Sequence, residues 1–103
     1  MTRRELLAWL DARRPAPPAA LRAHLEAGAT ESEEPLPEHL ADLGELLVSR
    51  VAGHPHGGRE LALDLLAADA FVTYAFEAQA EADVTRLAAL ADRVTAGRRR
   101  YTT

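Results

Sequence analysis

The sequence predicts an all-α protein, built as a small bundle of four to five helices. Leucine and alanine dominate its apolar residues while isoleucine is absent, and the two abundant residues are strong helix formers. Apolar residues also recur with a helical period along most of the 103-residue chain. Finally, the segment from Arg59 to Ala96 contains neither glycine nor proline, the residues that most often interrupt a helix.

The first helix is predicted over residues 2–14. Thr2 and Glu5 match a capping box, in which the threonine hydroxyl accepts from the glutamate amide and the glutamate side chain reaches back. Leucines and Trp9 then supply one apolar face. Pro15 disfavours helical backbone at the residue before it, so the helix should end there.

The next two helices are predicted over residues 17–27 and 36–52, with an acidic loop over 28–35 between them. Proline suits the first turn of each helix, and Gly28 is a natural left-handed cap for the earlier one. The later helix should end at Gly53, and its apolar residues repeat every three to four positions. This stripe consists of Leu36, Leu40, Leu43, Leu47 and Val51.

The glycine-free segment is predicted to form two helices, over residues 59–82 and 83–97. A single helix of this length is the alternative, but such a helix is rare in a small domain. Asp83 is a favourable N-cap, and two weak helix formers follow it. Residues 1–97 are therefore expected to form one helical domain, followed by a basic tail over 98–103.

The helix over 59–82 carries two apolar faces. One arc, which should face the core, consists of Leu61, Leu65, Ala68, Val72, Ala75 and Phe76. The second face consists of Leu63, Leu66, Ala67, Ala70, Phe71 and Tyr74. A surface helix normally has one apolar stripe, so the second face is either wrapped by the other helices or covered by a partner. For the latter case we predict a homodimer or a complex with another protein.

Asp69 falls at the edge of the arc that should face the core. Burial would raise the pKa of its carboxyl group unless a cation pairs with it. Arg50, Arg86 and Arg93 are the candidates for that cation. A structural ion pair is the simpler interpretation, because a perturbed carboxylate alone is weak support for catalysis.

The segment from Gly53 to Arg59 places two histidines, a proline and two glycines before the long helix. Its simplest interpretation is a tight turn with a glycine cap. Alternatively, it binds an anion at the helix N-terminus, where exposed amides and the helix dipole attract negative charge. The candidate anion-binding residues are His54, His56, Gly57, Gly58 and Arg59. No further ligand stands at a suitable spacing for a metal, so we predict no metal site.

Two other histidines, His24 and His39, lie in the similar pentads LRAHL and LPEHL. Each falls at the flank of its helix's leucine stripe. If their helices pack antiparallel, the two imidazoles can approach each other and bind a metal or respond to pH. The simpler interpretation is that each histidine is satisfied separately, because further ligands are lacking.

The sequence contains no recognisable catalytic site. Cysteine is absent, and the two serines match no nucleophile motif. The net charge of −4 argues against nucleic-acid binding, and no cofactor motif is found. Neither a signal peptide nor a membrane-spanning stretch is apparent, which predicts a cytoplasmic protein without membrane insertion. We therefore expect a non-enzymatic helical interaction module, a small accessory or adaptor protein, with an anion- or metal-binding protein as the alternative.

Overall fold

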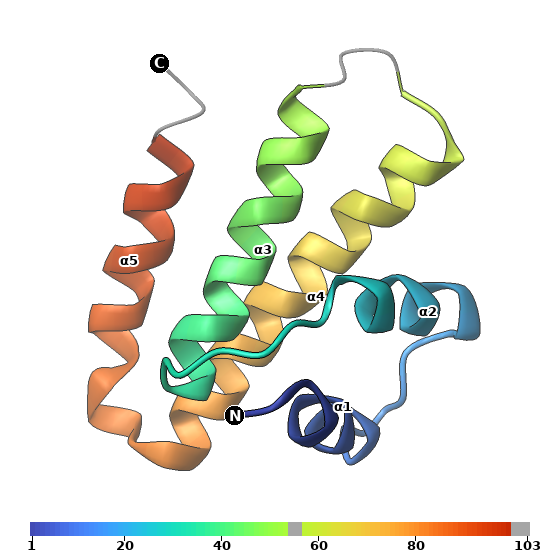
Figure 1. The fold of residues 1–103 in the computed structure, drawn as a ribbon. Coiled ribbons are helices and arrows are strands. Elements are labelled where there is room, and N and C mark those ends of the chain that lie inside the picture. Colours follow the sequence, from blue (N-terminus) through green and yellow to red (C-terminus); the bar gives the residue numbers. More distant parts are fainter. Residues whose placement is uncertain (54–56, 100–103) are drawn as a thin grey trace.

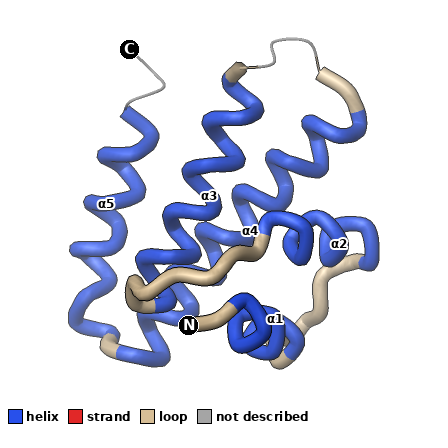
Figure 2. Tube along the Cα trace, viewed as in Figure 1, coloured by secondary structure: helices blue, strands red, loops and turns tan. Residues whose placement is uncertain are grey.

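The computed structural model describes residues 1–53 and 57–99, which form five α-helices, one 3-10 turn and no strand (Figures 1 and 2). The α-helices are α1 (Arg3–Asp11), α2 (Ala19–Gly28), α3 (Leu36–Ala52), α4 (Arg59–Ala82) and α5 (Leu87–Arg99). The 3-10 turn, η1 (Val84–Arg86), directly precedes α5. The predicted all-α bundle is confirmed, and so is the predicted division of the glycine-free segment into two helices.

An antiparallel pair, α3 and α4, forms the centre of the bundle (Figure 1). The two short N-terminal helices lie across this pair, and α2 packs directly on α4. From another side, α5 packs against both members of the pair. This arrangement leaves one long side of α4 without a covering helix.

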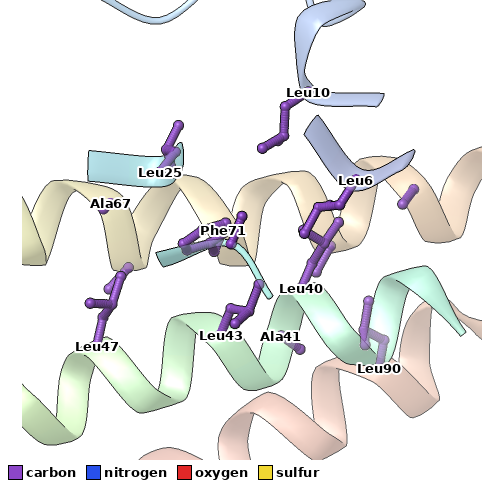
Figure 3. Close-up of a cluster of buried hydrophobic side chains, with 14 residues drawn as sticks. Leu6, Leu10, Leu25, Leu40, Ala41, Leu43, Leu47, Ala67, Phe71 and Leu90 are labelled. Carbon is purple, nitrogen blue, oxygen red and sulfur yellow. The ribbon is translucent and has the colours of Figure 1, made fainter. Parts of the chain in front are cut away.

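The core is centred on Phe71 of α4, whose side chain is fully buried. Leucines from three helices surround it, and Figure 3 shows them converging from α1, α2 and α3. The fully buried members are Leu6, Leu25 and Leu40. Between α3 and α4, Gly44 permits a close approach, because a Cβ atom there would lie 2.8 Å from Val72 Cγ2. The N-terminal helices therefore complete the core of the central pair.

The start of α1 and the break after α4 both follow predicted caps. The Thr2 hydroxyl accepts from the Glu5 amide at 3.1 Å, and the Glu5 carboxylate accepts from the Thr2 amide at 2.9 Å. The hydrogen bond from the Thr2 amide contributes most to lowering the pKa of the Glu5 carboxyl group. After α4, the Asp83 carboxylate accepts from the hydroxyl and the amide of Thr85, which lowers the pKa of Asp83. The capping box and the N-cap at Asp83 are confirmed.

Two predicted helix ends near prolines differ from the structure by three and two residues. We predicted the first helix to reach residue 14, but α1 ends at Asp11. The amide of the next residue, Ala12, donates a hydrogen bond to the Trp9 carbonyl at 3.2 Å, which forms a tight turn. We predicted the second helix from residue 17, but α2 begins at Ala19. Pro18 pushes the residue before it into extended backbone and itself has an extended ψ of 153°.

Gly28 does not act as the predicted left-handed cap, whereas α3 ends just before Gly53, as predicted. No glycine among the described residues adopts the left-handed backbone conformation, and the φ of 166° at Gly58 is extended backbone. Gly28 is the last residue of α2, and Gly53 follows α3 with a φ of −79°. The final helix passes through the buried Gly97 and ends at Arg99, two residues beyond the predicted end. Gly28 and Gly97 therefore lie within helices, and Gly53 caps α3.

Candidate partner-binding surface

The predicted partner face of α4 is divided between the core and the surface. Ala67 and Phe71 are fully buried within the chain, so they belong to the core and present no surface to a partner. Half-buried positions of the same face are Leu63, Ala70 and Tyr74. Leu66 alone is largely exposed, at 54%. The covering helix is α2, whose last residue, Gly28, lies close to the Phe71 ring.

The arc of α4 that we predicted to face the core is divided in the same way. Ala68 and Ala75 are buried, but Leu65 is 54% exposed. The remaining members, Leu61, Val72 and Phe76, are half-buried. The core face of α4 lies midway between the two predicted arcs, because α2 and α3 pack against α4 from two directions. Leu65 is therefore a surface residue, contrary to the prediction.

The uncovered side of α4 presents exposed residues that are mostly apolar or small. We call this surface the leucine strip, and it consists of Ala62, Leu65, Leu66, Asp69, Thr73 and Ala80. Its two leucines are adjacent, and they are two of the five most exposed large apolar side chains in the described chain. The solvent side of a helix normally carries charged and polar residues. An exposed helix face with one charge in six residues is typical of a protein interface.

Asp69 is the single charge of the leucine strip, and its predicted burial is wrong. The predicted pairing with an arginine is also absent from the ion pairs of the described residues. At about 100° per residue, Asp69 points away from Phe71 by close to half a turn. Its carboxylate therefore stands in solvent beside Leu65 and Leu66.

The buried acid of α4 is Asp64, which the sequence analysis did not single out as buried. Its Oδ1 atom lies 3.3 Å from His24 Nε2 of α2 and 3.8 Å from Arg50 Nη1 of α3. The same histidine nitrogen lies 3.5 Å from a carboxylate oxygen of Glu60. Around the axis of α4, Asp64 lies between the two predicted apolar arcs, and this is the direction of the core. The cluster joins three helices.

The second histidine is satisfied elsewhere. His39 of α3 is buried, and its Nε2 atom lies 3.1 Å from the Thr30 carbonyl oxygen in the loop between α2 and α3. The two histidines thus have different partners, as the simpler interpretation predicted. Within the described ranges, no group of three or more acidic or histidine side chains is arranged to hold a metal.

Part of the predicted anion loop lies outside the described residues. His54 and His56 belong to that part. Gly57, Gly58 and Arg59 are exposed, and Gly58 occupies the N-cap of α4 with an extended backbone. No hydrogen bond from a side chain caps this helix end.

A charged and aromatic cluster fastens α1 to the C-terminal half of α4. The guanidinium of Arg13 donates to Glu77 at 3.1 Å and to Glu81 at 2.9 Å, and it lies 3.9 Å from the centre of the Trp9 ring. The bond to Glu81 contributes most to raising the pKa of Arg13. The edge of one ring of the Trp9–Tyr74 pair meets the face of the other, and burial raises the pKa of Tyr74. Tyr74 is thus engaged within the chain.

The hollows between α3 and α5 are small or open. The hollow lined by Val48, Val72 and Val94 has a volume of about 20 Å³, room for roughly one water molecule. Arg93, which lines the same hollow, pairs with Glu34 and Asp42 at the surface, and its bond to Asp42 contributes most to raising its pKa. Neither feature encloses a site for a small molecule.

No family model, curated protein or solved structure matches the chain significantly. In addition, no helix of the described ranges is both long and apolar enough to cross a membrane. Among the surfaces of the described residues, the leucine strip is the one with two adjacent exposed leucines.

Proposed function

We propose that this protein is a non-enzymatic helical interaction module, a cytoplasmic accessory or adaptor protein that binds another protein chain through the leucine strip. The observation that carries the proposal is the exposure of Leu65 and Leu66 on a helix whose opposite face already fills the core. Fold stability does not require these two leucines to be apolar, because they contribute little to the core. Binding of a partner that covers Leu65 and Leu66 would explain why both positions are apolar.

The free energy gained by covering Leu65 and Leu66 is moderate. Full burial of a leucine side chain is worth roughly 1.5–3 kcal/mol, so covering two half-exposed leucines contributes about 2 kcal/mol. The helix that carries them is held by Phe71 and by Asp64, which makes the strip a rigid surface. A rigid surface loses little conformational entropy on binding, which favours a specific complex.

Binding is better supported than catalysis. The buried carboxylate of Asp64 is already engaged by His24 and Arg50, as expected for a structural ion pair. The hollow lined by Val48, Val72 and Val94 has room for roughly one water molecule, and the larger hollow beside Asp42 and Ala96 is open to solvent, so neither encloses a substrate.

Site-specific photo-crosslinking tests the proposal. A photoreactive residue replaces Leu66 in one variant and Ala89, an exposed residue of α5, in a control variant. Both variants are expressed in the source organism and irradiated. We expect a covalent protein adduct from position 66 and none from position 89, and the adduct should disappear when Leu65 is changed to Asp. Equal labelling at both positions, or none at either, contradicts the proposal.

A further inference from the structure

We infer that the partner of the leucine strip is a second copy of this chain, bound with its α4 antiparallel to the first and related by a twofold axis. This inference rests on the proposed function and adds the identity and orientation of the partner. Three observations on α4 carry it: the position of two opposite charges, the position of the leucines between them, and the length of the helix.

The first observation is a pair of opposite charges along one edge of the leucine strip. Arg59 and Glu77 are 18 residues apart, which corresponds to about five full helical turns, so they lie on one line along α4. Arg59 is exposed and forms no ion pair with another described residue. One oxygen of Glu77 accepts from Arg13, while its side chain remains 42% exposed. An antiparallel second copy places each Arg59 opposite Glu77 of the other chain, twice by symmetry. A parallel copy would place like charges together.

The second observation is the position of the leucines relative to that symmetry. The midpoint between residues 59 and 77 is residue 68, and Leu65 and Leu66 lie within three residues of it. The exposed leucines of both chains therefore meet near the twofold axis, and the charges form the rim. Ala62, Ala70 and Thr73 are small enough for the two helices to pack at the usual distance of about 8–10 Å.

Asp69 is the one residue that opposes this arrangement. It lies one position from the midpoint, so the twofold axis brings the Asp69 carboxylates of the two chains onto the same side of the helix pair. Asp69 lies between Leu65 and Leu66 around the helix, so the two carboxylates face each other near the centre of the contact, and their repulsion weakens the dimer. Asp69→Asn is consequently expected to strengthen association.

The third observation, the length of α4, sets the expected affinity. Its 24 residues span about 36 Å, and a pair of helices in contact over this length buries roughly 1,000 Å² in total. That area is at the low end for specific complexes. We therefore expect a weak dimer that dissociates on dilution.

Sedimentation of the purified full chain tests the inference. Measured from about 1 µM to 1 mM, a range that spans the dissociation constants of weak dimers, the mass should rise from 11.2 kDa toward twice that value. Leu66→Asp should abolish the rise. The matched control is Leu46→Asp on α3, because Leu46 is 60% exposed but lies outside the leucine strip. This control should associate like the original chain.

Charge reversal tests the antiparallel orientation. Arg59→Glu and Glu77→Arg should each weaken self-association by about threefold to tenfold, since each converts two attractive pairs into two repulsive ones. An equimolar mixture of the two variants should recover the association, because in the mixed dimer both pairs are attractive again. Circular dichroism checks that each variant remains folded.

The outcomes separate this inference from the proposed function. A constant mass of one chain at every concentration overturns the second copy, whereas an adduct between position 66 and a different protein would still support the proposed function. Equal loss of association in Leu46→Asp and Leu66→Asp also overturns the inference. A mixture of the charge-reversed variants that associates no better than either alone overturns the antiparallel orientation.

Discussion

Replacing Gly44 with alanine tests how closely α3 and α4 pack. The added Cβ atom would lie 2.8 Å from Val72 Cγ2, 3.1 Å from the Ala68 carbonyl oxygen and 3.6 Å from Phe71 Cβ. The first distance is shorter than carbon atoms tolerate, so something has to move. Valine in a helix has one strongly preferred side-chain conformation, and the carbonyl belongs to the backbone of α4. Neither neighbour can yield without separating the two helices.

Two opposing effects determine whether Gly44→Ala raises or lowers the free energy of unfolding. Alanine is favoured over glycine inside a helix by about 1 kcal/mol. Overpacking a core typically costs about 1–3 kcal/mol, and contact with backbone favours the upper half of that range. We therefore expect Gly44→Ala to lower the free energy of unfolding by about 1–2 kcal/mol.

Urea denaturation followed by circular dichroism measures this change. In a Val72→Ala chain the closest contact is absent. Adding Gly44→Ala to that chain should therefore lower the free energy of unfolding by less than it does in the original chain. The matched control is Gly53→Ala at the end of α3, where the nearest atoms lie 3.6 and 3.8 Å away. That control should change stability by less than about 0.5 kcal/mol. A Gly44→Ala chain as stable as the original would refute the close approach of α3 and α4.

Five further substitutions test the core, the buried and exposed acids of α4, and the caps. Phe71→Ala should lower the unfolding free energy by about 3–5 kcal/mol in urea, and a loss below 1 kcal/mol would contradict its place at the centre of the core. Asp64→Ala should cost about 1–3 kcal/mol, whereas Asp69→Ala should be nearly neutral in the same assay; the reverse order would contradict their assigned burial. Thr2→Ala should cost about 1 kcal/mol through loss of the α1 cap, measured by thermal unfolding. Folding lowers the pKa of Asp83 from its ordinary 3.8, so the stabilisation of the fold by its carboxylate is complete above that pH and is lost as the pH falls through the lower folded value. The stability difference between the original chain and Asp83→Asn should therefore shrink below pH 3.8, and a constant difference would exclude this effect.

The ends of helices were predictable where a side chain supplies the missing hydrogen bond. Thr2, Glu5 and Asp83 each carry an oxygen that reaches a backbone amide a few residues away, so the local sequence determines the geometry. The ends near glycine and proline were less predictable. Gly97 continues inside α5 and packs against the flexible end of the Glu45 side chain of α3, a contact between helices that the local sequence does not show.

The partition of α4 shows why the candidate surface was only partly predictable. Its apolar residues cover more than half of the helix circumference, so hydrophobic periodicity alone does not define which direction is inward. The choice is made by α2 and α3, which contact α4 from two directions and bury the residues between the predicted arcs. Asp64 fits this inward position because His24 and Arg50 arrive with those two helices, while Asp69, with no such neighbour, remains outside. Leu65 and Leu66 belong to different predicted arcs, yet they border the same uncovered side. An excess of apolar residues beyond what the core uses was therefore readable from the sequence, whereas the position of that excess depends on the packing of three helices.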